Sequence, residues 1–175
     1  MRWIAFAILL YLITVLQTSA VPFLAVHTVR PDLMVILAVH YALLAPAADA
    51  MLACWCIGLV IDLAGMSYAQ HSNVGVNALA LGLLGLFIVK VRELTFRESP
   101  VTQLAFALIV KLALALLVGL HMLYVLDAWD RFGEVLTTAI WSAVYTAVLA
   151  PYAHWVLRRF RRVLGVGVAH RLRVR

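Results

Sequence analysis

The chain has 175 residues, of which 66% are hydrophobic and only 13% are charged, whereas about a quarter of the residues of a soluble domain are charged. Its formal net charge of +6 is interpreted as membrane topology and attraction to anionic lipid headgroups, not as nucleic-acid binding. The composition excludes an ordinary soluble domain and predicts an integral membrane protein with one domain.

Positive charge is concentrated in three places. Eleven of the fourteen Lys and Arg residues are Arg2 and the basic residues of segments 90–97 and 158–175. Basic segments stay cytoplasmic because Lys and Arg resist translocation, so we expect both termini to be cytoplasmic and 158–175 to form a basic cytoplasmic tail. The lipid and topology anchors expected in this tail are Arg158, Arg159, Arg161 and Arg162.

Six apolar runs reach or approach the roughly 20 residues that a transmembrane helix needs. Together they predict an all-α integral membrane domain of six transmembrane helices over residues 1–157. The loops expected on the outer side hold only two basic residues, which agrees with the charge distribution. The runs are Trp3–Val26, Asp32–Pro46, Ala48–Met66, Val74–Val91, Val101–Leu126 and Gly133–Leu157, and the outer loops are 27–31, 67–73 and 127–132.

The first two runs each have an alternative interpretation. Residues 4–16 resemble the apolar part of a signal peptide, but Pro22 just past the loose cleavage site at 18–20 favours an uncleaved first helix. The second run is short and is tightly joined to the third. Residues 32–66 are therefore either two full spans or a helical hairpin that does not cross completely.

Asp62 is the sharpest functional signal, because an ionisable residue inside a span is expensive and usually faces a partner or a cavity. It lies near the outer end of the third run, and Arg30 lies at the outer start of the second. We therefore expect Asp62 to contact Arg30. This contact is either functional or an ion pair that only locks two helices together.

Lys111 lies ten residues into the fifth run, about 15 Å from its inner end and near the middle of the bilayer. No carboxylate of another span is expected at this depth. Its side chain is therefore expected to bond backbone carbonyls, face a wet cavity or contact a partner protein. His40 and His121 are also intramembrane, and each is expected to hydrogen-bond a neighbouring helix.

Two local patterns predict how helices begin and pack. Gly75 and Asn77 suit a sharp re-entry into the fourth run, with polar side chains capping the helix. Ala139, Ala143 and Ala147 repeat every four residues, which is the small-residue stripe that lets membrane helices approach closely.

Signatures of catalysis and of metal or cofactor binding are missing from the sequence. It has no His-Glu-x-x-His helix, no Gly-x-Ser-x-Gly elbow, no phosphate loop and no paired intramembrane carboxylates. Cys54 and Cys56 would lie about 200° apart on a helix, a poor arrangement for a metal or a disulfide. We expect a protein without enzyme activity and without a cofactor.

An ordered set of motifs resembles a known family. Arg30-Pro31-Asp32-Leu33 opens the second run, Ala45-Pro46 closes it, Gly58-x-x-x-Asp62-Leu63 and Gly75-x-x-Ala78-Leu79 follow, and an Arg-rich tail comes after a last span that contains proline. In this order and spacing the residues resemble the MreD family of rod shape-determining proteins, most densely across 30–82. The candidate structural, partner or ligand contacts are Asp62, Arg30, Asp32, Lys111, Gly75 and Asn77.

The resemblance implies a small multi-pass component of the bacterial inner membrane that acts in cell elongation and peptidoglycan synthesis. It implies association with the single-span protein MreC and, through the complex, with the MreB filament, the RodA glycosyltransferase and a transpeptidase. It also implies a fold similar to the substrate-binding subunits of energy-coupling-factor transporters, with six helices around a pocket.

Three functional hypotheses follow. The favoured one is a non-catalytic scaffold that binds partners through intramembrane helix faces. The second is a membrane subunit that binds a small molecule or lipid in a pocket near Asp62, Arg30 and the outer loops. The third, an unrecognised membrane enzyme, is the least favoured.

Overall fold

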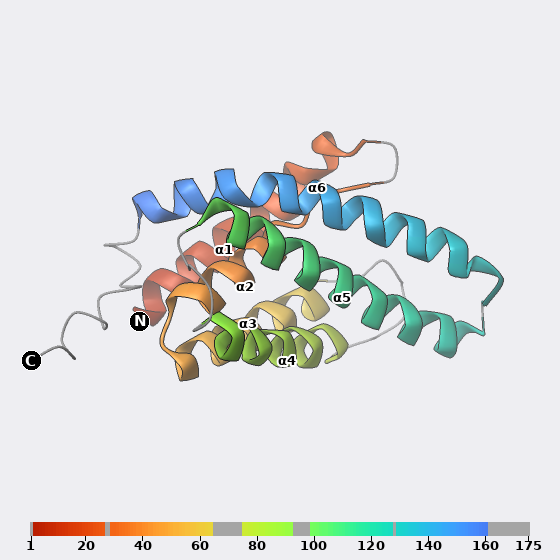
Figure 1. Ribbon diagram of the computed structural model, residues 1–175, viewed down its shortest axis with the longest axis horizontal. Coiled ribbons are helices and arrows are strands. Elements are labelled where there is room, and N and C mark those ends of the chain that lie inside the picture. The colour runs from red at the N-terminus through yellow and green to blue at the C-terminus, as the bar shows by residue number, and fades with distance from the viewer. Residues whose placement is uncertain (1, 27–28, 65–74, 93–98, 128, 161–175) are drawn as a thin grey trace, which may run out of the picture.

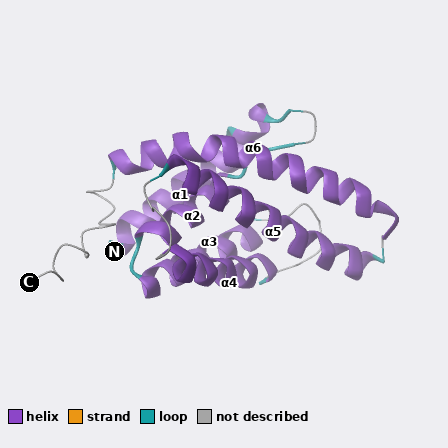
Figure 2. Cartoon of the chain, viewed as in Figure 1, coloured by secondary structure: helices purple, strands orange, loops and turns teal. Residues whose placement is uncertain are grey.

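The computed structural model describes residues 2–26, 29–64, 75–92, 99–127 and 129–160 and builds them almost entirely from helices (Figures 1 and 2). Helix α6 ends at the same end of the molecule at which α1 begins (Figure 1). The α-helices in this part of the chain are α1 (Trp3–Ser19), α2 (Leu33–Leu44), α3 (Ala47–Leu63), α4 (Val76–Val91), α5 (Pro100–Leu126) and α6 (Phe132–Arg159), with the short 3₁₀ helices η1 (Val21–Leu24) and η3 (Trp129–Arg131).

The helices differ widely in length. Helices α5 and α6 have 27 and 28 residues, so each is about 40 Å long. They are the two helices among the described residues that are long and apolar enough to cross a membrane unaided. Helix α2 has only 12 residues and is about 18 Å long, well short of the ~30 Å hydrocarbon core. The expected second span is therefore not one crossing helix.

The expected first span also differs from the structure, because α1 ends at Ser19 and does not continue to Val26. Pro22 lies in the first turn of η1, where its missing N–H is tolerated. Val26 and Val29 then pair in an isolated bridge, and residues 29–32 lead to the start of α2.

Two helix pairs form the frame through small residues. In the α3–α4 pair, a Cβ added at Gly85 would lie 2.8 Å from Cys54 Sγ, and Cys54 is buried as a packing residue. In the α5–α6 pair, Gly119 faces Val135 closely. The predicted stripe of Ala139, Ala143 and Ala147 is buried, as expected for a packed helix face.

Helix α2 is the centre of the molecule. Ten of its twelve residues are buried, from Met34 to Leu43, and it contacts α1, α3, α4, α5 and α6. Both ends of this short helix therefore lie inside protein, where their unpaired backbone groups need protein partners.

Candidate functional site: a polar junction and a cavity at the start of α2

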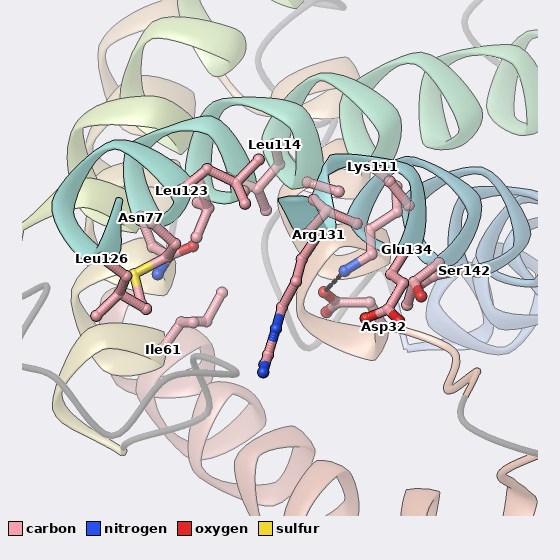
Figure 3. A pocket seen from close by; sticks show the side chains of 17 residues that line it. Asp32, Ile61, Asn77, Lys111, Leu114, Leu123, Leu126, Arg131, Glu134 and Ser142 are labelled. Carbon is pink, nitrogen blue, oxygen red and sulfur yellow. Dashed lines mark hydrogen bonds and ion pairs between the residues drawn. The ribbon is translucent and has the colours of Figure 1, made fainter. Parts of the chain in front are cut away.

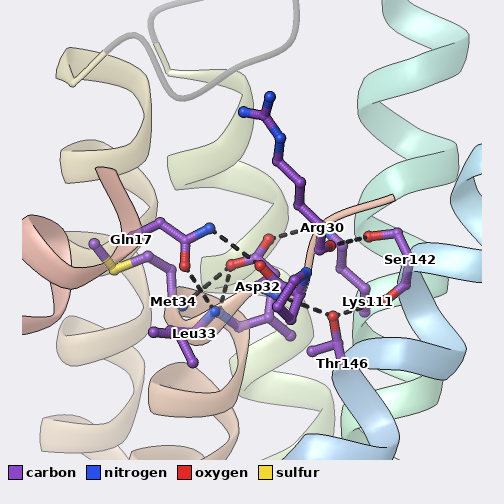
Figure 4. Close-up of polar contacts among 10 residues, drawn as sticks. Gln17, Arg30, Asp32, Leu33, Met34, Lys111, Ser142 and Thr146 are labelled. Carbon is purple, nitrogen blue, oxygen red and sulfur yellow. Dashed lines mark hydrogen bonds and ion pairs between the residues drawn. The ribbon is translucent and has the colours of Figure 1, made fainter. Parts of the chain in front are cut away.

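The chain enters α2 through an irregular segment, and helix α1 supplies its first hydrogen bonds. The Gln17 side chain donates from Nε2 to Pro31 O at 3.3 Å, and its Oε1 accepts from Leu33 N at 2.9 Å. One amide thus satisfies both a carbonyl and an N–H of the incoming backbone (Figure 4). Non-helical backbone at membrane depth is tolerated only with such internal partners.

Helix α6 supplies the other backbone contacts of this segment. Ser142 Oγ donates to Arg30 O at 3.1 Å, and Thr146 Oγ1 accepts from Asp32 N at 3.1 Å. Ser142 and Thr146 are one helical turn apart on the buried face of α6, so together they hold two successive points of the entering chain. We call residues 30–35 with Gln17, Lys111, Ser142 and Thr146 the α2 junction.

Asp32 joins the cap of α2 to an ion pair. Its Oδ1 accepts from Met34 N and Val35 N, both at 3.1 Å, which satisfies free N–H groups of the first turn and places negative charge at the positive end of the helix dipole. Its Oδ2 lies 2.6 Å from Lys111 Nζ of α5, and both side chains are largely buried. The Asp32 carboxylate therefore links two helices at the centre of the protein.

The expectation that no carboxylate matches the depth of Lys111 is wrong, because α2 begins deep inside the molecule. Helices α2 and α5 run in opposite directions (Figure 1). Asp32 lies about 18 Å from the end of α2 at Leu44, and Lys111 lies about 17 Å from the start of α5 at Pro100, at 1.5 Å per residue. The two charges consequently meet at one level.

Below the junction, the residues one helical turn further along α2, α5 and α6 form successive layers of the protein interior. Ile36 of α2, Ala107 of α5 and Ala150 of α6 form an apolar cluster. One further turn on, the rings of His40 and His154 meet edge to face with centroids 5.1 Å apart, and His154 Nδ1 lies 2.9 Å from Ala150 O. An apolar layer thus separates the charged junction from a buried histidine pair.

Asp62 caps helix α4 and does not pair with Arg30, so the predicted contact between them is wrong. Its Oδ2 accepts from Gly75 N at 2.9 Å and from Ala78 N at 3.1 Å. Its Oδ1 accepts from Asn77 N at 3.3 Å and from Asn77 Nδ2 at 2.8 Å. The free N–H groups at the start of α4 attract the carboxylate, and the cap is supplied by α3 and not by α4 itself.

The spacing of Gly58 and Asp62 explains this geometry. A Cβ added at Gly58 would overlap the carbonyl oxygen of Asn77 and the backbone of Ala78, so only glycine lets α4 begin directly against α3. One turn later, Asp62 reaches the exposed N–H groups. Gly75 has a φ of 104°, in the left-handed region that glycine adopts readily, and this lets the chain turn into α4.

A cavity of about 420 Å³ opens beside the junction. Its floor includes the Asp32–Lys111 pair, its walls come chiefly from α5 and α6, and Ile61 and Asn77 close the side formed by α3 and α4 (Figure 3). Arg131 extends across it at the end where α5 turns into α6 (Figure 3). The volume lies within the range of small-molecule sites.

The comparison with family profiles identifies the chain, because the profile of rod shape-determining protein MreD matches residues 1–160. The chain belongs to the MreD family. Searches of curated proteins and of solved structures found no match. MreD proteins are inner-membrane proteins of the rod-shape complex with MreC and MreB, and they are shape-determining structural proteins that are not known as enzymes.

The candidate contact residues predicted from the sequence divide into two groups in the structure. Asp62, Gly75 and Asn77 come together at the start of α4, and Asp32 meets Lys111 at the junction. The Arg30 side chain points away from the Asp32 carboxylate and the Lys111 ammonium group (Figure 4). Among the expected anchors, Arg158 and Arg159 end α6, while Arg161 and Arg162 lie outside the described residues.

Sequence reasoning missed several residues that hold α2. Arg92 is buried, and its Nη1 donates to Ala42 O at 2.7 Å and Ala45 O at 2.6 Å, which caps the C-terminal end of α2 with positive charge. In the sequence, Arg92 is one of the basic residues of segment 90–97, and nothing in its pattern distinguishes it from Lys90 and Arg97. Gln17 was detectable as the one amide side chain in the first apolar run.

Proposed function

We propose that this chain is a non-catalytic scaffold of the bacterial cell-elongation complex. It binds MreC and neighbouring wall-synthesis proteins through intramembrane helix faces, and it meets the MreB filament, a RodA-type glycosyltransferase and its transpeptidase through the complex. Membership of the MreD family supports the role in rod-shape determination, and the internal use of the polar groups supports the scaffold.

The observation that carries this proposal is that the deep charged groups brace helices. Asp32 bonds two backbone N–H groups and Lys111, while Asp62 bonds the first turn of α4. Arg92 bonds the end of α2. Each of these groups joins different helices. This is expected of a rigid protein that binds partners through its surface and does not use its buried charges for chemistry.

The outer face of α6 is a suitable binding surface. Exposed apolar residues recur there at spacings of three and four, while the opposite face is buried through small residues such as Ala143 and Ala147. A stripe of this spacing fits another helix laid alongside. The exposed stripe consists of Trp141, Val144, Val148, Tyr152 and Trp155.

The proposed topology has six passes and cytoplasmic termini. The common end of α1 and α6 (Figure 1) supports an even number of crossings, and the basic ends of α4 and α6 support a cytoplasmic location for that end. In this topology, the non-helical residues 29–32 extend the second pass, because α2 covers only about half of the bilayer. Residues 1–157 form the membrane domain, and 158–175 form the basic tail.

The cavity favours a second candidate function. A pocket enclosed by helices is the arrangement expected of a subunit resembling the substrate-binding component of an energy-coupling-factor transporter. Such a subunit would bind a small molecule or lipid in the cavity beside the α2 junction and would assemble with paired ATPases.

Purification of the tagged chain from its native host in gentle detergent, with mass spectrometry of the proteins that accompany it, separates the two functions. The scaffold predicts recovery of a single-span MreC-type protein and of wall-synthesis enzymes. Recovery of paired ATPases and a coupling subunit without these proteins would replace the scaffold with the transport function.

A further inference from the structure

The cavity beside the junction is elongated and runs toward the α5–α6 turn. Along α5 its lining extends from Lys111 to Leu126, and along α6 from Ser142 to Glu134, with Arg131 of η3 beyond it. Fifteen residues of α5 correspond to about 22 Å. The cavity therefore reaches from the middle of the molecule to one end of its longest helices.

The chemistry of the lining changes along this length. At the floor, Asp32 and Lys111 are bonded to each other and Asp32 also to backbone N–H groups, so these charges already have partners. The walls above are mostly alkyl side chains, including Leu114, Val118 and Leu123, with Asn77 and Thr138 as uncharged polar residues among them. The exposed charged side chains of the lining, Arg131 and Glu134, lie at the mouth.

The depth of the apolar part matches one leaflet. From Leu114 to Leu126, α5 rises about 18 Å, and half of the hydrocarbon core is about 15 Å. The α2 junction accordingly marks the bilayer middle, while Arg131 marks the headgroup level.

We propose that this cavity binds one acyl chain of a phospholipid from the leaflet at the α5–α6 turn. In this arrangement the Arg131 guanidinium binds the lipid phosphate, and the Glu134 carboxylate of the same lining complements an amine on the headgroup, so an aminophospholipid fits both residues. The alkyl chain enters with its polar end outward, because the floor has no charge left to pair. This inference rests on the membrane location of the MreD family and not on the scaffold role.

Filling the cavity provides the first test. Ala115 lines it, whereas Leu117 faces outward on the same helix, so Ala115→Trp and Leu117→Trp add an indole inside and outside the site. The proteins are purified in detergent, and the phospholipid remaining per protein is measured by lipid extraction and native mass spectrometry. We expect about one aminophospholipid per wild-type and Leu117→Trp protein and at least a fivefold loss for Ala115→Trp. Equal retention by all three would overturn the proposal.

The headgroup provides a second test, which also covers the case in which Ala115→Trp does not fold. The delipidated protein is titrated with phosphatidylethanolamine in detergent micelles and, separately, with inorganic phosphate. Arg131→Gln is expected to weaken phosphatidylethanolamine binding at least tenfold, while Lys90→Gln, which removes an exposed positive charge in the last turn of α4 and outside the cavity, leaves it unchanged. Equal binding by both variants, or binding of phosphate as tight as that of the lipid, contradicts a phospholipid site.

Discussion

Replacing Lys111 by Met should destabilise the protein strongly, because it removes the cation from a buried ion pair and leaves the Asp32 carboxylate in place. Only 7% of the Lys111 side chain and 16% of the Asp32 side chain are exposed. Breaking a buried pair on one side costs about 3–5 kcal/mol. We expect about 3 kcal/mol, the lower end, since Asp32 keeps its two backbone N–H donors. This corresponds to roughly a hundredfold change in the unfolding equilibrium.

The free energy of unfolding is measured by titrating the detergent-solubilised protein with sodium dodecyl sulfate and following tryptophan fluorescence. Lys90→Met is the matched control, because Lys90 is exposed in the last turn of α4, and it should change stability by less than about 0.5 kcal/mol. The double variant Asp32→Asn/Lys111→Met should recover most of the loss, since Asn keeps an oxygen for the cap. The argument fails if Lys111→Met and Lys90→Met are equally stable.

Three further substitutions test the other contacts by the same titration. Gly58→Ala should lower the free energy of unfolding by more than about 1 kcal/mol, because the added methyl group meets the backbone of α4. In the control Gly133→Ala the added methyl group meets nothing within 4 Å, so the change should be neutral or stabilising by up to about 1 kcal/mol. Equal effects of the two substitutions would show that α3 and α4 have room to separate. Asp62→Ala should cost about 1–2 kcal/mol through loss of the α4 cap, and Asp62→Arg should not be rescued by Arg30→Asp, since rescue would restore the ion pair that the structure lacks. Arg92→Met should cost about 2 kcal/mol by removing charged hydrogen bonds from the end of α2, and a stability equal to that of wild type would contradict this cap.

The helical architecture was predictable because apolar runs and basic stops act locally along the chain. Helix α5 begins at Pro100 and ends at Leu126, within one residue of the expected run, and α6 is similarly close. The first run was predicted too long because hydropathy continues through Pro22, where the backbone does not remain α-helical. An apolar sequence indicates that a segment is surrounded by lipid or protein, but it does not indicate where the helix ends.

The partners of the charged residues were the part that sequence could not provide. The sequence predicts an Asp62–Arg30 pair because both residues are expected near the outer surface. The actual partners of Asp62 are backbone N–H groups at the start of α4, and a pattern of charged side chains does not reveal backbone partners. Asp32 was treated as the outer start of a span, although α2 begins at mid-depth. Five of the candidate residues, Asp32, Lys111, Asp62, Gly75 and Asn77, nevertheless take part in contacts between helices.

The scaffold role is tested most directly by photo-crosslinking in the native host. A photoreactive amino acid is placed in turn at the exposed α6 positions Trp141, Val148, Tyr152 and Trp155 and at exposed positions of α1 such as Ile8. Crosslinked proteins are then identified by mass spectrometry. The account predicts adducts with an MreC-type protein or a wall-synthesis enzyme at neighbouring positions of at least one helix face. Adducts only with transporter ATPase components, or with no protein at any position, would contradict it.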